Sequence, residues 1–482
     1  MRVGLEQIPE PGRRVLAALA ELAGPARPAW MVGGALRELL AGGVAADLDV
    51  AVAGGALDLG RRVADRLDAR FVVLDAARGT GRVVPRSPGV AMDLVDLRAP
   101  TLEGDLRARD FTVNALAVGV DDLLGAGRAV VIDPTGGLDD LRDRVVRACG
   151  PTSVSDDPVR MLRGVRLALR PGWRLHESLE AAIAAAAPLI TRVARERVRD
   201  ELVGILAAPT AAAGLRRLDR LGVLGVLLPE SLAMRATAQP LPHHFDVWEH
   251  SLRAVEGVDA LLAGLDALAP WASALRAHLG EHLGDGMTRG ETLKLAALLH
   301  DVAKPETRLD DGVRIRFIGH DAAGARRALD IAWRLRLSRR AALVLERLVA
   351  EHLRPMHLAH AGAITRRARF RFFRALGGEA RDLLLLALAD AAALSGASPL
   401  AVWAGPDGGV VRALIAGADE EIGAAAAPPL LRGQDVMVAF GLPPGPELGR
   451  LLARAREAQA LGLVTTRDEA LDYLRKEPPP GT

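Results

Sequence analysis

Hydrophobic and polar positions follow two different patterns along the chain. Up to about residue 150, short apolar runs typical of strands alternate with segments of helical period, which predicts an α/β domain. From about residue 156 onward the helical period dominates. The runs that predict strands are WMVGGA, ADLDVAV, RFVVLD, GVAMDLVDL and AVVIDP. With breaks rich in proline and glycine, these patterns predict separate regions at residues 25–150, 151–230, 240–405 and 406–475.

The composition narrows the class of protein. The chain has 482 residues, half of them apolar, and a net charge of +2, so it tolerates an anionic partner without requiring one. Its single cysteine, Cys149, excludes an intramolecular disulfide and a cysteine-based zinc site and fits a reducing compartment. The N-terminus lacks the apolar core of a signal peptide, and Asp390 and Pro399 interrupt the longest apolar stretch, residues 383–405. We therefore expect a cytoplasmic protein with no membrane span.

Two carboxylates interrupt the predicted strand ADLDVAV. Asp47 and Asp49 are two residues apart, so on a strand they point to the same face. Their repulsion is costly unless a cation neutralises it, and Mg²⁺ prefers carboxylate and phosphate oxygens. A third acid would complete a two-metal site for phosphoryl or nucleotidyl transfer, and the strand pattern of GVAMDLVDL offers both Asp93 and Asp96.

A glycine pair precedes these acids. Gly33 and Gly34 in VGGALRELL stand at the predicted start of a helix, where backbone N–H groups can approach a phosphate. A glycine pair alone is weak evidence. Followed at this distance by Asp-x-Asp, it indicates a nucleotide site.

These motifs, with others further along the chain, resemble those of a known family. VGGALRELLAGGVAADLDVAV resembles the signature of class II tRNA nucleotidyltransferases and bacterial poly(A) polymerases, of the polymerase-β-like superfamily. Glu38 stands where the family usually has aspartate, and Ala108 replaces a frequent arginine. Further motifs follow in the family's order: RDFTVNALAV (109–118), IDPTGGLDDLRDRVVR (132–147), DDPVRMLRGVRLALR (156–170) and ARERVRDEL (194–202).

The resemblance implies a fold, a reaction and a set of site residues. The fold would be an α/β nucleotidyltransferase head followed by a mainly α-helical neck, body, HD domain and tail. The enzyme would add C or A residues from CTP or ATP to the 3′ end of tRNA, with Mg²⁺ held by Asp47, Asp49 and Asp93, or Asp96 in place of Asp93. The nucleotide-binding residues would be Gly33, Gly34, Arg37, Arg109, Asp110, Asn114, Asp157, Arg160 and Arg163.

Asp157 and Arg160 have two interpretations. Three residues apart on a predicted helix, they fit an ordinary helix ion pair. The resemblance implies instead that they replace a template. The carboxylate would accept from the exocyclic amine of cytosine or adenine, and the guanidinium would donate to the ring. Uracil and guanine present a carbonyl where the amine should be.

The sequence indicates the reaction more firmly than it indicates which nucleotides are added. In the family, addition of the terminal A usually requires a flexible loop between the third carboxylate and RDFTVNA. Here only residues 97–108 lie between, without the Asp-Gly or Arg-Arg-Pro pattern of such loops. This favours the CC-adding subtype. Full CCA addition, A addition and poly(A) synthesis stay open.

A second set of chemistry-bearing residues lies in the helical half. The order His250, His300–Asp301, His320, His352, Asp390 resembles the HD phosphohydrolase domain. These are suitable ligands for a divalent transition metal, which would activate water against a phosphate ester such as a cyclic phosphate or a 2′-phosphate at an RNA end. Lys304 would neutralise phosphate charge, or be an exposed helix-end lysine. A degenerate structural domain is one alternative, and an enzyme whose main activity is the HD hydrolase is another.

The arginine-rich stretch ITRRARFRFFRAL (364–376) has two interpretations. Arginines could contact phosphates while phenylalanines stack on bases. An amphipathic helix with buried phenylalanines and solvated arginines also explains the pattern and is the favoured interpretation. The region at 406–475 would pack against the body and contact tRNA.

Overall fold

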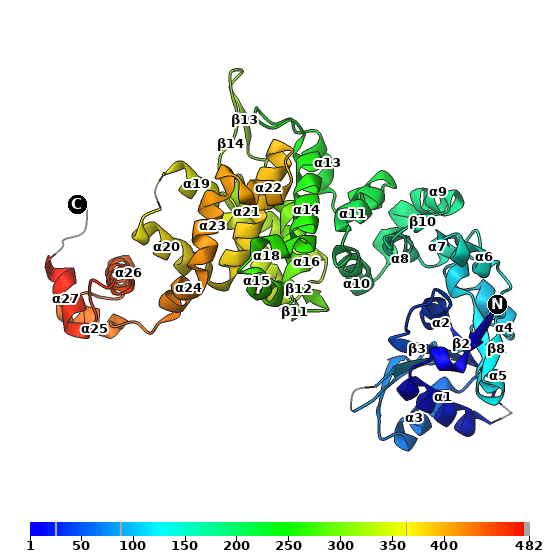
Figure 1. Cartoon of the computed structure of the whole chain (residues 1–482). Coiled ribbons are helices and arrows are strands. Elements are labelled where there is room, and N and C mark those ends of the chain that lie inside the picture. Colours follow the sequence, from blue (N-terminus) through cyan, green and yellow to red (C-terminus); the bar gives the residue numbers. More distant parts are fainter. Residues whose placement is uncertain (25–26, 87–88, 363, 477–482) are drawn as a thin grey trace. The chain divides into compact units, whose positions relative to one another are not determined.

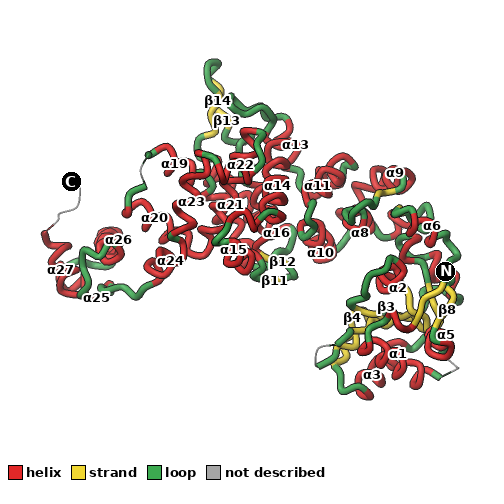
Figure 2. The backbone as a smooth tube through the Cα atoms, viewed as in Figure 1, coloured by secondary structure: helices red, strands yellow, loops and turns green. Residues whose placement is uncertain are grey.

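The computed structural model describes residues 1–24, 27–86, 89–362 and 364–476. It divides into two compact units: the first holds residues 1–201 and 217–227, and the second holds residues 202–216 and the chain from residue 228 onward. Figures 1 and 2 show strands concentrated in the N-terminal part and helices in the rest. None of the helices among the described residues has the length and apolar character needed to cross a membrane.

A mixed sheet forms the centre of the head. Its six strands lie in the order β4-β5-β6-β3-β2-β7. β3 and β6 are parallel neighbours, whereas β2 pairs with β3 and β7 in antiparallel fashion. The strands are β2 (Ala29–Val32), β3 (Asp47–Val52), β4 (Arg70–Asp75), β5 (Thr80–Val84), β6 (Ala91–Asp96) and β7 (Ala117–Gly119).

The alternation along β3 explains how the sheet buries one face and leaves another for chemistry. Leu48, Val50 and Val52 are fully buried, and α1 and α3 cover that region of the head. Asp47 and Asp49 point to the opposite face, as the period of two requires. The predicted strands at β2, β3, β4 and β6 are present. β7 was not predicted because it has only three residues, and β5 because it carries glycine and arginine among its apolar residues.

Helices surround the sheet and continue into the neck. Two short strand pairs lie outside this sheet. β1 (Arg2–Gly4) pairs with β8 (Arg128–Val130), and β9 (Val145–Val146) pairs with β10 (Arg174–Leu175). The helices are α1 (Glu10–Ala23), α2 (Gly33–Leu40), α3 (Ala56–Arg66), α4 (Leu102–Arg107), α5 (Val120–Ala126), α6 (Gly137–Arg142), α7 (Ser153–Asp156), α8 (Arg160–Leu167), α9 (Glu177–Ala186), α10 (Arg195–Leu206), α11 (Ala211–Arg220) and α12 (Val223–Leu227).

The second unit is built around a bundle of five helices. These are α14 (Val247–Ala263), α16 (Arg289–Leu299), α17 (His320–Arg334), α18 (Arg339–Glu351) and α21 (Ala380–Ser395), drawn in green to yellow in Figure 1. Gly257 lets α14 and α21 approach closely, since a Cβ at this position would lie only 3.0 Å from the Cα of Ala389. The smaller elements are α13 (Glu230–Arg235), α15 (Ala272–Leu279), α19 (Arg354–His360), α22 (Pro399–Ala404), α23 (Gly409–Ala416), α24 (Ala418–Ala426), β11 (His282–Gly284), β12 (Met287–Thr288), β13 (Arg308–Asp310) and β14 (Ile315–Phe317).

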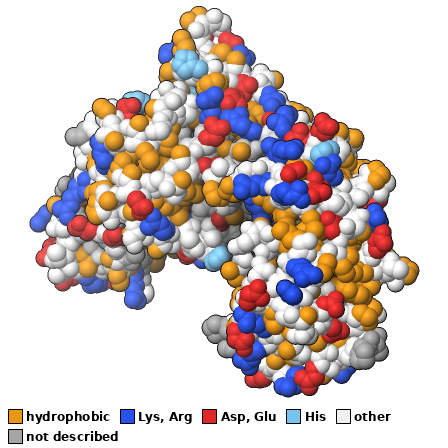
Figure 3. Space-filling model, turned by 45° about the vertical axis from the view of Figure 1, so that its right-hand side comes forward, with side chains coloured by type: hydrophobic (Ala, Val, Ile, Leu, Met, Phe, Trp, Pro, Cys, Tyr) orange, Lys and Arg blue, Asp and Glu red, His pale blue; other side chains and the backbone are white. Residues whose placement is uncertain are grey.

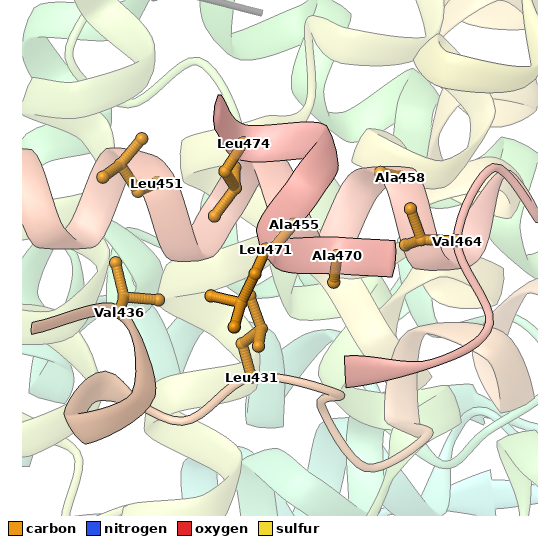
Figure 4. Close-up of a cluster of buried hydrophobic side chains, with 9 residues drawn as sticks. All are labelled: Leu431, Val436, Leu451, Ala455, Ala458, Val464, Ala470, Leu471 and Leu474. Carbon is orange, nitrogen blue, oxygen red and sulfur yellow. The ribbon is translucent and has the colours of Figure 1, made fainter. Parts of the chain in front are cut away.

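The C-terminal helices have a small core of their own. Apolar side chains of α25 (Gly433–Phe440), α26 (Pro446–Ala460) and α27 (Arg467–Lys476) meet around Leu431 and Val464. Figure 4 shows these side chains facing one another.

The arginine-rich stretch forms α20 (Arg366–Leu376). Phe370, Phe372 and Phe373 are buried, so the amphipathic interpretation is confirmed and these rings do not stack on bases. Arg371 binds Glu457 of α26 at 2.9 Å. α20 therefore attaches the tail to the bundle.

Candidate active site

The register of the sheet brings two acids together. Asp49 of β3 lies directly opposite Asp93 of the parallel strand β6. Asp96 belongs to the other face of β6, and its carboxylate accepts from the backbone N–H of Ala56 at 2.8 Å, where it caps α3. The geometry therefore favours Asp93 over Asp96 as the third acid.

An arginine that the sequence did not indicate neutralises these acids. Arg82 of β5 donates to both oxygens of Asp93, at 2.6 and 2.8 Å, and lies 3.8 Å from Asp47. With Asp93 turned to Arg82, the three head acids are not among the compact groups of ligand atoms found in the described residues.

The donor set nevertheless fits Mg²⁺. Burial raises the pKa of Asp49, and the nearby charge of Asp93 raises it further. A bound divalent cation would offset the free-energy cost of keeping these two carboxylates ionised side by side. Hard carboxylate oxygens are the ligands this ion prefers.

The glycine pair makes room for Asp49. Gly33 has φ of +70°, and a Cβ there would lie 2.9 Å from Oδ2 of Asp49. That same oxygen accepts from the backbone N–H of Ala35 at 3.1 Å. α2 begins at Gly33, as predicted. In this structure the start of the helix orients the carboxylate of Asp49 as well as facing the cavity.

A chain of polar contacts runs from α2 to α10. Arg37 donates to the side-chain oxygen of Asn114, whose amide donates to Asp110 at 3.0 Å. Arg163 lies 3.4 Å from Asp110 and donates to Glu201 at 2.8 Å. Burial would raise the pKa of Asp110, but the charge of Arg163 and the hydrogen bonds it accepts hold the pKa below its usual value.

Glu38, the departure from the family's usual aspartate, has its own contacts. Its carboxylate accepts from Arg37 at 2.8 Å and also from Arg170. The longer side chain therefore joins α2 to the segment that follows α8. The substitution keeps Arg37 paired and adds a link to the neck.

The segment between the third acid and Arg109 is folded. Asp105 of α4 is fully buried, accepts from the backbone N–H of Arg98 at 3.0 Å and pairs with Arg109 at 3.0 Å. Residues 97–108 are thus fixed by one carboxylate near both ends. Arg109, itself 7 % exposed, is held at the cavity by this partner.

Asp157 and Arg160 do not pair with each other as a helix ion pair would. Arg197 of α10 binds both oxygens of Asp157, at 3.0 and 2.8 Å. Arg160 donates to Oγ of Ser153 at 2.8 Å and to the carbonyls of Arg109 and Ala108 at 3.3 and 3.2 Å. The helix-pair interpretation is wrong because α7 ends before Asp157 and α8 begins at Arg160.

These residues line one cavity of about 1250 Å³ within the first unit. Its wall brings aspartates, arginines and the two residues Asp157 and Arg160 into one space. On the face shown in Figure 3, basic and acidic side chains are interspersed. Of the predicted site residues, the cavity is lined by Gly33, Gly34, Arg37, Asp49, Asp93, Asp96, Arg109, Asp110, Asn114, Asp157, Arg160 and Arg163. Asp47 lies next to Arg82.

The predicted ligands of the second unit also meet. His250 of α14 lies 2.9 Å from Asp390 of α21, and His300, directly after α16, lies 3.1 Å from Asp301. His320 and His352 approach within 3.2 Å. The ligand atoms form two groups, each within 4.8 Å: His250, His300 and Asp390, and Asp301, His320 and His352.

Backbone carbonyls set the tautomers of these histidines. Nδ1 of His300, His320 and His352 lies 2.9, 2.6 and 2.7 Å from the carbonyls of Ala297, Phe317 and Val349. A carbonyl can only accept, so each Nδ1 carries a proton, and Nε2 is the ring atom left to face the ligand group. This is the orientation in which histidine binds a metal.

Asp301 lies between the two groups. Its Oδ2 is 3.1 Å from Nε2 of His300, and its Oδ1 is 3.4 Å from Nε2 of His320. Atoms that share one ion at about 2 Å are separated by about 3 Å. The arrangement therefore fits two ions with one carboxylate oxygen directed at each.

Lys304 is buried, so the exposed helix-end interpretation is wrong. It is 7 % exposed, and its Nζ lies 2.7 Å from Asp301 and donates to Gln239 at 2.7 Å. The lysine charge thus faces the ligand group rather than solvent.

Comparisons with known proteins match both units of the chain. Sequence profiles match "Poly A polymerase head domain" at residues 73–147, "Probable RNA and SrmB- binding site of polymerase A" at 172–234 and "HD domain" at 247–396. An A-adding tRNA nucleotidyltransferase of Deinococcus radiodurans is 36% identical, covering 94% of this chain and 97% of its own. A CC-adding tRNA nucleotidyltransferase of Geobacter sulfurreducens is 33% identical, covering 93% and 92%. The chain belongs to the tRNA nucleotidyltransferase family.

The fold of this tRNA nucleotidyltransferase agrees with solved structures. The Bacillus stearothermophilus CCA-adding enzyme in complex with CTP matches with a TM-score of 0.62 and 22% identity, covering 97% of this chain and 98% of that one. The predicted fold class, an α/β head followed by helical neck, body, HD domain and tail, is confirmed.

Several residues that shape the head site of this tRNA nucleotidyltransferase were not predicted. ARERVRDEL was recognised as a motif, but nothing in its pattern says which residues its side chains contact. Their partners lie far away in the sequence, for example 40 residues between Arg197 and Asp157. The residues are Arg82, Asp105, Ser153, Arg197 and Glu201.

Proposed function

We propose that this tRNA nucleotidyltransferase is of the CC-adding subtype and extends tRNA 3′ ends with CTP. The observation that carries the proposal is the folded segment 97–108. Asp105 fixes it near both ends, and α4 occupies half of it, so it has no free length to act as a mobile loop. The named relatives include both CC-adding and A-adding enzymes, so A addition is the second candidate.

The reaction would be an in-line attack of the tRNA 3′ hydroxyl on the α-phosphate of the nucleotide, with pyrophosphate leaving. Bound Mg²⁺ would activate the hydroxyl and stabilise the charge of the transition state. Asp47, Asp49 and Asp93 would hold the ions, and Arg82 would have to release Asp93 from its bidentate contact for this. Arg109, Asn114 and Arg163 would hold the phosphates and ribose, and Asp157 with Arg160 would read the base.

Primer extension tests the proposal. We would offer tRNA transcripts that lack the whole CCA end, and others that lack only the final A, with Mg²⁺ and CTP, ATP or both. Two residues added from CTP, with no A on either transcript, is the expected result. Addition of A to the second transcript alone would identify an A-adding enzyme, and full CCA synthesis would contradict the argument from segment 97–108.

Gly33→Ala is expected to lower kcat for nucleotide addition by about tenfold or more, because a misplaced catalytic group is costly. Alanine would be strained at φ of +70° and would press on Asp49, whereas a Cβ at Gly34 meets the same oxygen at an ordinary 3.5 Å. Gly34→Ala is therefore the matched control and should retain most activity. Equal kcat values for the two variants, with melting temperatures unchanged, would contradict this role of Gly33.

For the HD domain we propose a two-metal phosphohydrolase that acts on phosphate esters at RNA ends. The specific support is the inward orientation of three Nε2 atoms around Asp301. When bound, transition-metal ions would supply a nucleophilic water at neutral pH. Lys304, adjacent to Asp301, would neutralise the phosphate.

An assay with RNA that ends in a 2′,3′-cyclic phosphate or a 2′-phosphate tests this activity. Chelator-treated protein is reloaded with Mn²⁺, Co²⁺, Ni²⁺ or Zn²⁺, and phosphate release is measured. Release that persists when Asp49 is replaced would assign it to the HD domain. No release with any of these ions would indicate a structural domain.

A further inference from the structure

Both oxygens of Asp157 are occupied by one arginine. Nη1 and Nη2 of Arg197 donate to Oδ1 and Oδ2 at 3.0 and 2.8 Å. The side chain of Asp157 is 19% exposed and that of Arg197 44%, and both line the cavity of the first unit. The contact is therefore at the wall of the site where the base would be read.

The geometry of this contact bears on selectivity. An aspartate side chain rotates broadly about its last torsion, whereas a bidentate guanidinium fixes the plane of the carboxylate. Each carboxylate oxygen has two lone pairs, so an oxygen that accepts from Arg197 can still accept from a base amine. Arg197 can thus orient Asp157 without blocking it.

The protonation state of Asp157 matters as much as its direction. An ionised carboxylate only accepts hydrogen bonds and so disfavours the carbonyls of uracil and guanine. A protonated one has an O–H that can donate to those carbonyls, and discrimination is lost.

The charges around Asp157 come from three helices. Arg197 is on α10, Arg160 and Arg163 are on α8, and Asp156 precedes Asp157 at the end of α7. Burial would raise the pKa of Asp157, but the hydrogen bonds and charge of Arg197, followed by the charges of Arg160 and Arg163, lower it. Arg160 donates to Ser153 and backbone carbonyls, and Arg163 to Glu201 and Asp110.

We propose that Arg197 is a positioning residue for nucleotide selection, which holds Asp157 as a fixed carboxylate that only accepts hydrogen bonds and thereby excludes uracil and guanine. Arg197 contacts no reacting atom in this role. The inference rests on the proposed nucleotidyl transfer and deepens it, because it says why the carboxylate can discriminate.

The test compares the ratio of kcat/KM for CTP to that for UTP in the full-length wild type, Arg197→Gln and Arg197→Lys. If the wild type adds only A, ATP and GTP take their place. We expect the ratio to fall about tenfold or more in Arg197→Gln, since a polar site discriminates strongly only while its groups are correctly paired. Arg197→Lys keeps the charge without the bidentate geometry and should fall between. Arg192→Gln, an exposed arginine nearby, is the matched control for charge and should keep the wild-type ratio.

A pH profile separates positioning from a purely structural role. Without Arg197 the pKa of Asp157 rises, so the ratio should decline at a higher pH in Arg197→Gln than in the wild type. An unchanged ratio together with a raised KM for tRNA would overturn the proposal and make Arg197 an RNA contact. If Arg197→Gln does not fold, Arg197→Lys decides between these results.

Different outcomes contradict the proposed function and the role of Arg197. No incorporation by the wild type would defeat the proposed function. Normal incorporation by the wild type, with the selectivity of both Arg197 variants intact, would defeat this inference alone.

Discussion

Asp49→Asn is expected to reduce nucleotide addition by at least about a thousandfold, because a carboxylate of a two-metal site contributes several kcal/mol and each 1.4 kcal/mol is tenfold in rate. The substitution keeps an oxygen that can accept from the N–H of Ala35, so the start of α2 should stay in place. Single-turnover rates on tRNA transcripts measure the effect.

Asp96→Asn is the matched control for Asp49→Asn. Both change one carboxylate of neighbouring strands to an amide. Asp96 also reaches the wall of the cavity, but it belongs to the opposite strand face from Asp93, and its carboxylate accepts from the N–H of Ala56 at the start of α3. We expect it to lower the melting temperature slightly and to keep most of the activity. A rate for Asp49→Asn within tenfold of the wild type, or a larger loss for Asp96→Asn, would show that the acids have been assigned to the wrong face.

Asp301→Asn should remove most bound transition metal from the HD domain and abolish its phosphohydrolase activity. One oxygen of Asp301 is directed at each ligand group, and the neutral amide leaves only one oxygen to bind. Nucleotide addition should be unchanged, because the head site lies in the other unit. Metal content after reloading and dialysis, measured by mass spectrometry, gives the result.

Asp390→Asn is the comparison for Asp301→Asn. Asp390 belongs to the group with His250 and His300 alone. We expect it to lose about one ion where Asp301→Asn loses two. Identical metal content in the two variants would argue against an arrangement with Asp301 shared between two ions.

The local sequence pattern identifies the acidic residues of the head site but not how they are arranged in space. The period of two along the strand places Asp47 and Asp49 on one face from the sequence alone. Choosing between Asp93 and Asp96 requires the pairing of β3 with β6, which depends on strands that the pattern does not align. Strand β5, which carries Arg82, was itself not predicted because glycine and arginine break its apolar run.

The same division holds in the second unit. The order of histidines and aspartates predicted which residues meet, and they do meet. It did not predict that the backbone sets three tautomers, or that Lys304 is buried against Asp301, because both depend on how α16 ends and what packs on it. Ion pairs between residues far apart in the sequence, such as Arg197 with Asp157, cannot be predicted from local composition.

The anchoring of Arg160 has an evolutionary consequence. Its guanidinium is tied to the carbonyls of Ala108 and Arg109, where the segment after the third acid ends. The C-terminal end of that segment and the arginine proposed to read the base therefore share one fixed point. An insertion upstream of Asp105 lengthens the segment and leaves this point in place. In such a lineage, we expect the number of nucleotides added to change while the choice among bases is inherited.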